Sequence, residues 1–171
     1  PKKLHLPPVE FPKTIHLSAS EDEKLMALTM ERIRHHGRLP ADPDRAAVYL
    51  ERLQKELEVI ACNGVVNFLP YFLVIDMEVC EYVRSAGVLA GPGRGSAAGS
   101  LLSYLLKITH VDPIAWSLSF ERFLSLGRIK RGKFPDIDLD FGDPQILIDH
   151  LAARYKDSFG RICTTGTMKL K

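Results

Sequence analysis

The sequence predicts a domain that mixes α-helices with β-strands, of the α/β or α+β class. Two long segments place apolar residues at helical spacing behind N-terminal capping signals. A short aromatic and β-branched run, residues 71–75, is typical of a buried strand. Residues 134–141 alternate acidic and apolar side chains, as a strand with one buried face does. Because such helices and strands alternate along the chain, a layered mixed fold is expected.

Length and composition indicate an ordinary globular protein. The 171 residues suit a single compact domain, and the hydrophobic share of 46% argues against disorder. No apolar run approaches the roughly 18 residues of a membrane helix, and the first residues lack the apolar stretch of a secretory signal. The three cysteines are far apart, which favours buried thiols in a reducing compartment. We therefore expect a cytoplasmic protein without a membrane partner. The formal net charge of +2 is too small to indicate a partner by itself.

The N-terminal part is expected to be a linker followed by a helix. Residues 1–19 are rich in proline and histidine and are predicted to be extended. Ser20 and Glu23 form a capping box, so a helix is expected to begin near Glu21 and to end before Gly37. Its inward-facing residues are predicted to be Leu25, Leu28 and Ile33.

A second helix is expected between a clear helix-start signal and a clear helix-stop signal. Asp42 is a capping residue with Pro43 in the first turn, and Asn63 followed by Gly64 ends the pattern. The apolar positions at helical spacing, predicted to face the core, are Leu50, Leu53, Leu57 and Ile60.

The second half of the chain is expected to alternate turns, helices and strands. A glycine-rich turn over residues 91–100 leads into a helix over residues 101–107. Residues 134–141 are predicted to be a strand, and Asp143 is predicted to cap the helix that follows. A last strand is expected over residues 161–165.

The acidic residues of the predicted strand are the first candidate site. Asp136, Asp138 and Asp140 are two residues apart, so a strand places them on one face, about 7 Å from one another. Like charges that close repel, and a divalent cation relieves the repulsion because hard ions prefer carboxylate oxygens. An EF-hand loop is excluded because its sixth position would be Phe141 rather than glycine. An exposed edge strand with a solvated acidic face is the alternative.

The glycine-rich turn is the second candidate site. Its backbone amides, together with Gly95, Ser96 and Arg94, are suited to bind a phosphate chain. The turn is not a Walker A loop, because no lysine follows it. It matches the dinucleotide fingerprint only in part, which leaves an oxidoreductase as a further alternative. A tight turn that merely packs a helix on a strand is the structural alternative.

A basic stretch lies between these two candidate sites. Its charged residues are Arg128, Lys130, Arg131 and Lys133. A solvated loop is one interpretation, and contact with nucleotide or nucleic-acid phosphates is the other.

Several ordered motifs together are similar to one family. They are residues 91–100, Ile108-Thr109 with Asp112-Pro113, residues 120–124 and residues 135–141, with 71–74 and 164–168 on either side. In this order and spacing they resemble the C-family bacterial replicative polymerases, the alpha subunits of DNA polymerase III. The resemblance covers about residues 45–168. It implies an α+β palm of the polymerase-beta nucleotidyltransferase type, with a small mixed sheet and helices packed on one face. Residues 20–171 would form part of this palm.

The resemblance also implies an activity and a set of site residues. The activity is template-directed DNA synthesis, in which two Mg²⁺ ions assist nucleotidyl transfer from a deoxynucleoside triphosphate to a primer 3′-hydroxyl. Asp136 and Asp138 match the catalytic, metal-binding carboxylates. The residues that match the nucleotide-binding positions are Gly95, Ser96, Arg94 and Arg122.

The resemblance further implies partners that this chain meets only as part of a longer protein. They are primer–template DNA, deoxynucleoside triphosphates and, through other regions, a sliding clamp and further replicase subunits. Since the family needs a third catalytic aspartate beyond residue 171, we expect a fragment that is inactive alone. The alternatives are a non-catalytic phosphate-binding or structural module and a dinucleotide-binding oxidoreductase domain.

Overall fold

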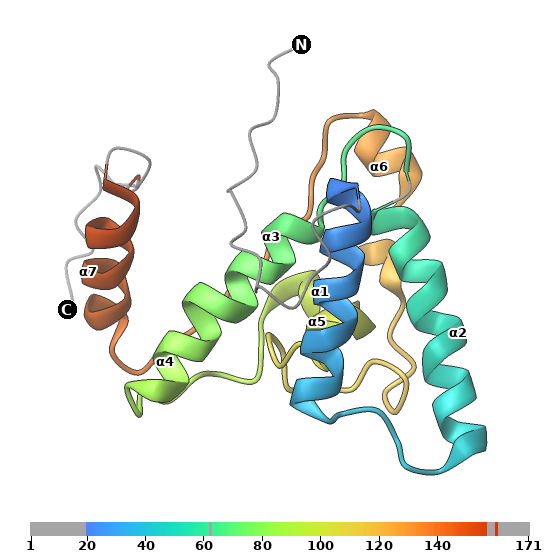
Figure 1. Ribbon diagram of the computed structural model, residues 1–171, viewed down its shortest axis with the longest axis horizontal. Helices are drawn as coiled ribbons and strands as arrows, with labels where there is room; N and C mark the ends of the chain where they lie inside the picture. The colour runs from blue at the N-terminus through green and yellow to red at the C-terminus, as the bar shows by residue number, and fades with distance from the viewer. Residues whose placement is uncertain (1–19, 62, 157–159, 161–171) are drawn as a thin grey trace, which may run out of the picture.

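The computed structural model describes residues 20–61, 63–156 and 160, and these residues form a helical domain (Figure 1). The first helices are α1 (Glu21–His36), α2 (Pro43–Ile60), α3 (Leu69–Val74), the π-helix η1 (Ile75–Cys80) and α4 (Glu81–Ser85). The later ones are η2 (Gly95–Gly99), α5 (Leu101–Leu105), η3 (Phe120–Arg122), α6 (Leu126–Lys130) and α7 (Pro144–Tyr155). In the described part, no helix is both long and apolar enough to cross a bilayer.

The predicted helix starts are confirmed. Ser20 Oγ accepts a hydrogen bond from the Glu23 amide, and the Glu23 carboxylate accepts one from the Ser20 amide. The Asp42 side chain accepts a hydrogen bond from the Arg45 amide at the start of α2. The prediction that Leu50 faces the core is wrong: it is 45% exposed, and Tyr49 is buried in its place.

The predicted fold class is wrong for the described residues, which contain no β-sheet and therefore no mixed sheet with helices on one face. Residues 71–75 belong to α3 and the start of η1 rather than to a strand. The buried residues there, Leu69, Phe72 and Leu73, recur at helical spacing, and Pro70 lies in the first helical turn. A short apolar run is compatible with either a strand or a helix. Here the buried side chains lie on one face of a helix.

The segment predicted as a strand over residues 134–141 is extended but has no ladder. Its bridge is an isolated antiparallel pair between Ala90 and Phe141. A sheet requires a run of inter-strand hydrogen bonds, and one bridge does not provide it. The predicted linker 1–19 and the predicted strand 161–165 lie outside the described residues.

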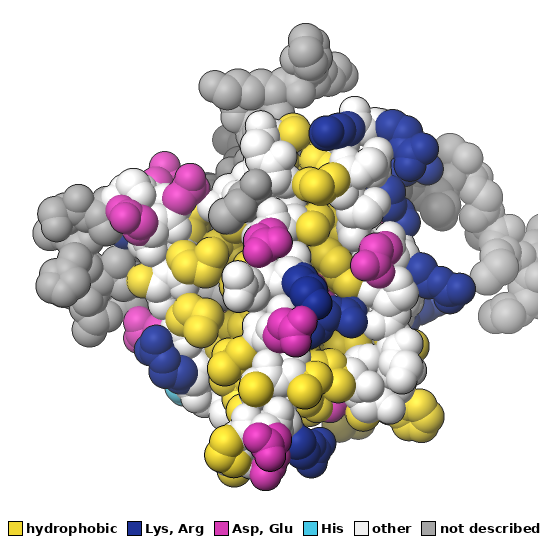
Figure 2. Space-filling view, turned by 90° about the vertical axis from the view of Figure 1, so that its right-hand side faces the viewer, with side chains coloured by type: hydrophobic (Ala, Val, Ile, Leu, Met, Phe, Trp, Pro, Cys, Tyr) yellow, Lys and Arg dark blue, Asp and Glu magenta, His cyan; other side chains and the backbone are white. Residues whose placement is uncertain are grey.

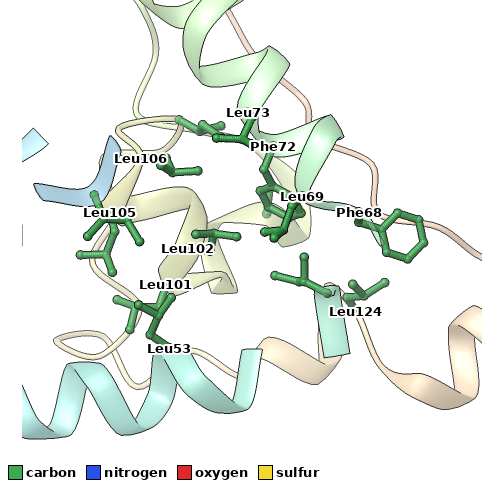
Figure 3. Packing of buried hydrophobic residues seen from close by; sticks show 14 of the residues in the cluster. Leu53, Phe68, Leu69, Phe72, Leu73, Leu101, Leu102, Leu105, Leu106 and Leu124 are labelled. Carbon is green, nitrogen blue, oxygen red and sulfur yellow. The ribbon is translucent and has the colours of Figure 1, made fainter. Parts of the chain in front are cut away.

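The core is centred on the leucines of α5 and its last turn. Figure 3 shows them between Leu53 of α2 and the aromatic side chain of Phe72 from α3. The fully buried leucines of this group are Leu101, Leu102, Leu105 and Leu106. Each contributes about 1.5–3 kcal/mol of burial free energy. The segment that directly follows the glycine-rich turn is therefore firmly anchored.

A buried ionic cluster attaches α1 to the rod formed by α3, η1 and α4. The Asp76 side chain is fully buried and lies 2.8 Å from Nε of Arg32 and 2.8 Å from Nε2 of His36. Arg84 approaches the same carboxylate at 3.4 Å. Burial acts to raise the pKa of Asp76, but the hydrogen bonds from His36 and Arg32 and the Arg32 charge outweigh it and lower the pKa. The cluster therefore holds Asp76 as an anion.

The helix α7 attaches to the α4 end of this rod, on the opposite side of the view from α2 (Figure 1). The His150 ring stacks on Tyr82 at 3.7 Å, and Nε of Arg154 lies 2.7 Å from the Glu78 carboxylate. The acidic extended segment leads directly into α7, so these contacts fix its C-terminal end.

Candidate functional site

The glycine-rich turn lies side by side with the acidic extended segment. The Gly91 amide donates to the Asp140 carbonyl at 2.9 Å, and the Gly142 amide donates to the Leu89 carbonyl at 2.9 Å. The Arg94 guanidinium pairs with the Asp140 carboxylate at 3.0 Å. The structure thus brings together two motifs that are more than forty residues apart in the sequence.

Asp138 lies directly against the backbone of the turn. Gly95 has a φ of +61°, in the left-handed region that favours glycine. A Cβ atom at this position would lie 3.0 Å from Oδ2 of Asp138. A glycine is therefore required here both by the backbone conformation and by the closeness of the carboxylate.

The acidic segment shows the alternation that its sequence predicts. Asp136 and Asp138 are exposed, whereas Ile137 and Leu139 are partly buried and pack against the core. The Ile137 amide donates to the Tyr71 hydroxyl at 3.2 Å, which anchors the segment to α3. Burial raises the pKa of Tyr71; the Ile137 amide opposes the rise, while the negative charges of Asp136 and Asp138 add to it. The two carboxylates are thus on the solvent side of the segment, and their charges act on the Tyr71 hydroxyl.

The available carboxylates fit part of a metal site. Among the described residues, no group of three or more histidine, cysteine, aspartate or glutamate side chains has the arrangement of a metal site. Asp140 is paired with Arg94, while no described ion pair engages Asp136 or Asp138. Two unpaired carboxylates supply the oxygen ligands that hard divalent cations prefer, but further ligands are needed to complete a site.

A hollow of about 540 Å³ opens beside the turn. Its lining combines backbone, hydroxyl groups and one guanidinium: Gly95, Ser96, Ala98, Gly99, Ser117, Leu118, Ser119 and Arg122. Three of the four predicted nucleotide-binding residues therefore border one space. The fourth, Arg94, is not among the lining residues and has Asp140 as its partner.

The comparisons with known proteins identify the family. Residues 23–171 match the family model of the bacterial DNA polymerase III alpha NTPase domain. The chain belongs to this family. The resemblance predicted from the motifs is confirmed.

Three relatives named DNA polymerase III subunit alpha illustrate the match. The one from Pseudomonas aeruginosa is 45% identical over 141 residues, which are 78% of this chain and 11% of the relative. The one from Mycobacterium tuberculosis (strain H37Rv) is 43% identical over 137 residues, again 78% of this chain and 11% of the relative. The one from Escherichia coli (strain K12) is 45% identical over 130 residues, 74% of this chain and 11% of the relative. The chain thus spans about a tenth of the length of these polymerase III alpha subunits.

Sequence analysis missed several residues that border the site. Ser117 and Ser119 line the hollow, and Tyr71 holds the acidic segment in this member of the polymerase III alpha family. The signal for Ser119 was its position directly before the Phe120–Arg122 motif. Tyr71 gave no usable signal, because its segment was interpreted as a strand.

The predicted basic stretch forms α6 and the turn after it. Arg128 donates to the Arg122 carbonyl, so α6 is connected to the residue that lines the hollow. Lys130, Arg131 and Lys133 are exposed. Figure 2 shows the side of the molecule that faces right in Figure 1, where hydrophobic side chains lie among charges of both signs. Lysine and arginine gather at the top of this face, the end at which α6 lies in Figure 1.

Proposed function

We propose that this chain is the part of a DNA polymerase that holds the incoming nucleotide and two ligands of its catalytic metals. The reaction is template-directed transfer of a nucleotidyl group from a deoxynucleoside triphosphate to a primer 3′-hydroxyl. One observation carries the proposal: the Asp138 carboxylate lies against Gly95, next to the hollow lined by Ser96 and Arg122. Carboxylates beside a hollow that offers hydroxyl groups and a guanidinium are suited to metal-assisted phosphoryl transfer.

Asp136 and Asp138 are proposed to be the catalytic carboxylates that bind Mg²⁺. When bound, the two metal ions would lower the pKa of the attacking hydroxyl and neutralise charge on the leaving pyrophosphate. The chain contributes orientation. Tyr71 and the partly buried side chains of Ile137 and Leu139 hold the extended segment so that both carboxylates stay on its outer side.

Gly95, Ser96 and Arg122 are proposed to bind the triphosphate in the hollow. The Ser96 hydroxyl can donate to a phosphate oxygen, and the Arg122 guanidinium compensates negative charge. Arg94 is proposed to be a fourth nucleotide contact at the edge of the site. Arg94 pairs with the exposed carboxylate of Asp140. To bind Arg94, a phosphate oxygen would have to share its guanidinium with Asp140 or displace Asp140 from it.

The proposed activity brings a set of partners. The DNA partner is a primer–template duplex, and the sliding clamp and other replicase subunits are proposed to act through regions that this chain does not include. With a bacterial replicative role, we propose that the protein acts in the cytoplasm. Because Asp136 and Asp138 alone leave the metal site incomplete, we expect no primer extension by the 171-residue chain itself.

Matched substitutions along the acidic segment test the proposal. In a polymerase III alpha subunit that contains these residues, Asp136→Asn and Asp138→Asn should each reduce Mg²⁺-dependent primer extension by about 10²-fold or more. Asp140→Asn removes the same charge from the same segment but affects a carboxylate already paired with Arg94, so its effect should be much smaller. Affinity for primer–template DNA serves as the folding control. Unchanged extension in Asp136→Asn and Asp138→Asn would instead support a non-catalytic phosphate-binding or structural module.

A further inference from the structure

A buried carboxylate caps α5, the helix that follows the glycine-rich turn. The Glu56 side chain, from α2, is fully buried. Its Oε1 accepts hydrogen bonds from the Leu101 amide and from Nε of Arg52, both at 2.9 Å. Its Oε2 accepts hydrogen bonds from the Leu102 amide and from the Ser100 hydroxyl, both at 3.1 Å. Each carboxylate oxygen therefore has two donors, and all of them except Arg52 belong to the start of α5.

The partner of Glu56 connects the two sides of the hollow. One terminal nitrogen of Arg52 donates to the Gly99 carbonyl at 3.0 Å and to the Leu118 carbonyl at 3.1 Å. Gly99 is the last residue of η2, which begins with Gly95 and Ser96. Leu118 lies just before η3, which ends with Arg122. A single guanidinium thus joins the side that carries Ser96 to the side that carries Arg122.

The backbones of these two sides are in close contact where Arg52 joins them. A Cβ atom on Gly99 would lie 2.6 Å from the Ser119 carbonyl oxygen, closer than any side chain tolerates. Gly99 and Ser119 both line the hollow. The relative position of its two sides is therefore set by a glycine contact and by the Arg52 hydrogen bonds directly beside it.

Stability alone does not account for this arrangement. Burial removes the hydration of Glu56 and most of that of Arg52, whose side chain is 26% exposed, and well-packed apolar residues often give equal or greater stability than such a pair. Burial raises the pKa of the Glu56 carboxyl, although the amides of Leu101 and Leu102 and the nearby Arg52 oppose that rise. Beyond the pair, Arg52 donates to the carbonyl groups of Gly99 and Leu118, which line the hollow. Glu56 accepts hydrogen bonds from Ser100, Leu101 and Leu102, the residues that directly follow Gly99.

We propose that Arg52 and Glu56 are positioning residues that fix the distance between the Ser96 side and the Arg122 side of the hollow, and so set its affinity for a deoxynucleoside triphosphate. This inference rests on the proposed function. Neither residue touches the triphosphate. Both act through the backbone of η2 and of the segment before η3, and a small displacement of groups that orient a reacting molecule has a large effect on binding and rate.

The test measures nucleotide affinity and DNA affinity separately. It uses a polymerase III alpha subunit that contains these residues, bound to a primer–template whose primer ends in a dideoxynucleotide. Glu56→Gln keeps the size of the side chain but turns an NH₂ group toward N–H or O–H donors. We expect it to weaken deoxynucleoside triphosphate binding about tenfold or more, because the start of α5 and the adjoining η2 have to shift away from the mismatched NH₂ group. Affinity for the primer–template should not change.

A second variant keeps the charge and decides the outcome if Glu56→Gln does not fold. Arg52→Lys retains a positive charge beside Glu56 but has a single nitrogen, so it cannot donate to Glu56 through one nitrogen and to both carbonyl groups through another. It should weaken nucleotide binding, and by less than Glu56→Gln where both fold. Unchanged nucleotide affinity in Arg52→Lys would overturn the proposal.

The matched control is Asp76, a second buried carboxylate that pairs with an arginine. Asp76→Asn disturbs a fully buried side chain hydrogen-bonded to Arg32, in a cluster that borders no part of the hollow. It should lower stability and leave nucleotide affinity unchanged. If Asp76→Asn weakens nucleotide binding as much as Glu56→Gln does, the effect is general destabilisation and the positioning role is refuted.

Failure of this inference can be told apart from failure of the proposed function. Ser96→Ala and Arg122→Ala remove groups proposed to contact the triphosphate directly. If both weaken nucleotide binding while the Arg52 and Glu56 variants do not, the positioning role alone is wrong. If Ser96→Ala and Arg122→Ala also have no effect, the hollow is not the triphosphate site and the proposed function itself is contradicted.

Discussion

Substitution of Gly95 by alanine tests the contact between the turn and the acidic segment. The left-handed backbone at this residue costs an L-amino acid about 1–2 kcal/mol. The added Cβ would also lie 3.0 Å from Oδ2 of Asp138, so the carboxylate or the turn has to shift by a few tenths of an ångström. A shift of about 1 Å in a catalytic group costs up to about 10²-fold in rate. We therefore expect a loss in primer extension of about tenfold from the displacement of Asp138 alone.

The chain offers a control that isolates the contact from the backbone strain. Gly87 has a similar φ of +69°, but a Cβ there would meet no atom within 4 Å. Gly87→Ala thus has the same type of strain without the contact to Asp138. The assay is single-turnover primer extension at saturating nucleotide by the alpha subunit that contains these residues, with DNA affinity measured in parallel. Equal extension rates for Gly95→Ala and Gly87→Ala would refute the reasoning.

Two further predictions concern stability. Because the folded-state pKa of Asp76 is lowered from 3.8, its contribution to stability is complete above that pH and is lost as the pH falls through the folded-state value. Urea unfolding at several pH values should show a fall in stability below about pH 4 that is smaller in Asp76→Asn, and an equal fall in both proteins would contradict this. Phe72→Ala should cost about 3–5 kcal/mol in the free energy of unfolding, because the fully buried ring contacts Phe123 and the α5 leucines. A cost below about 1 kcal/mol would show that this part of the core is not tightly packed.

Local signals in the sequence correctly predicted where α1, α2 and α7 begin, because N-terminal capping is decided within a few residues. Ser20 with Glu23 and Asp42 with Pro43 form the caps that their sequence indicates. Asp143 likewise caps α7. Each of these hydrogen bonds depends on near neighbours in the chain, which a sequence shows directly.

Strand pairing could not be predicted in this way, because it depends on residues that are distant in the sequence. Residues 134–140 have the alternation of a strand and adopt an extended conformation, yet the partner at Ala90 pairs at one position only. The segment around Tyr71 has the composition of a strand and forms a helix, because Leu69, Phe72 and Leu73 fill the core from one helical face.

The residue types of the candidate site were predicted from the sequence. The buried side chains that hold the site in place were not predicted. Sequence motifs selected Asp138 and Ser96, and the structure places Asp138 against the turn that carries Ser96. Glu56 was overlooked although it carried a signal: a charged residue inside the apolar stripe of α2, between Leu53 and Ile60. A buried charge destabilises the fold unless it has hydrogen-bond or ionic partners. The partners of Glu56 at the start of α5 lie over forty positions away in the sequence.

The most direct test of the central claim is a count of bound metal. In the ternary complex of the alpha subunit with primer–template and nucleotide, Mn²⁺ can replace Mg²⁺ and be counted by electron paramagnetic resonance. We expect Asp136→Asn and Asp138→Asn each to lose or weaken bound Mn²⁺, and Asp140→Asn to bind it as the unaltered protein does. Full Mn²⁺ binding by both Asp136→Asn and Asp138→Asn would contradict the assignment of these carboxylates as metal ligands.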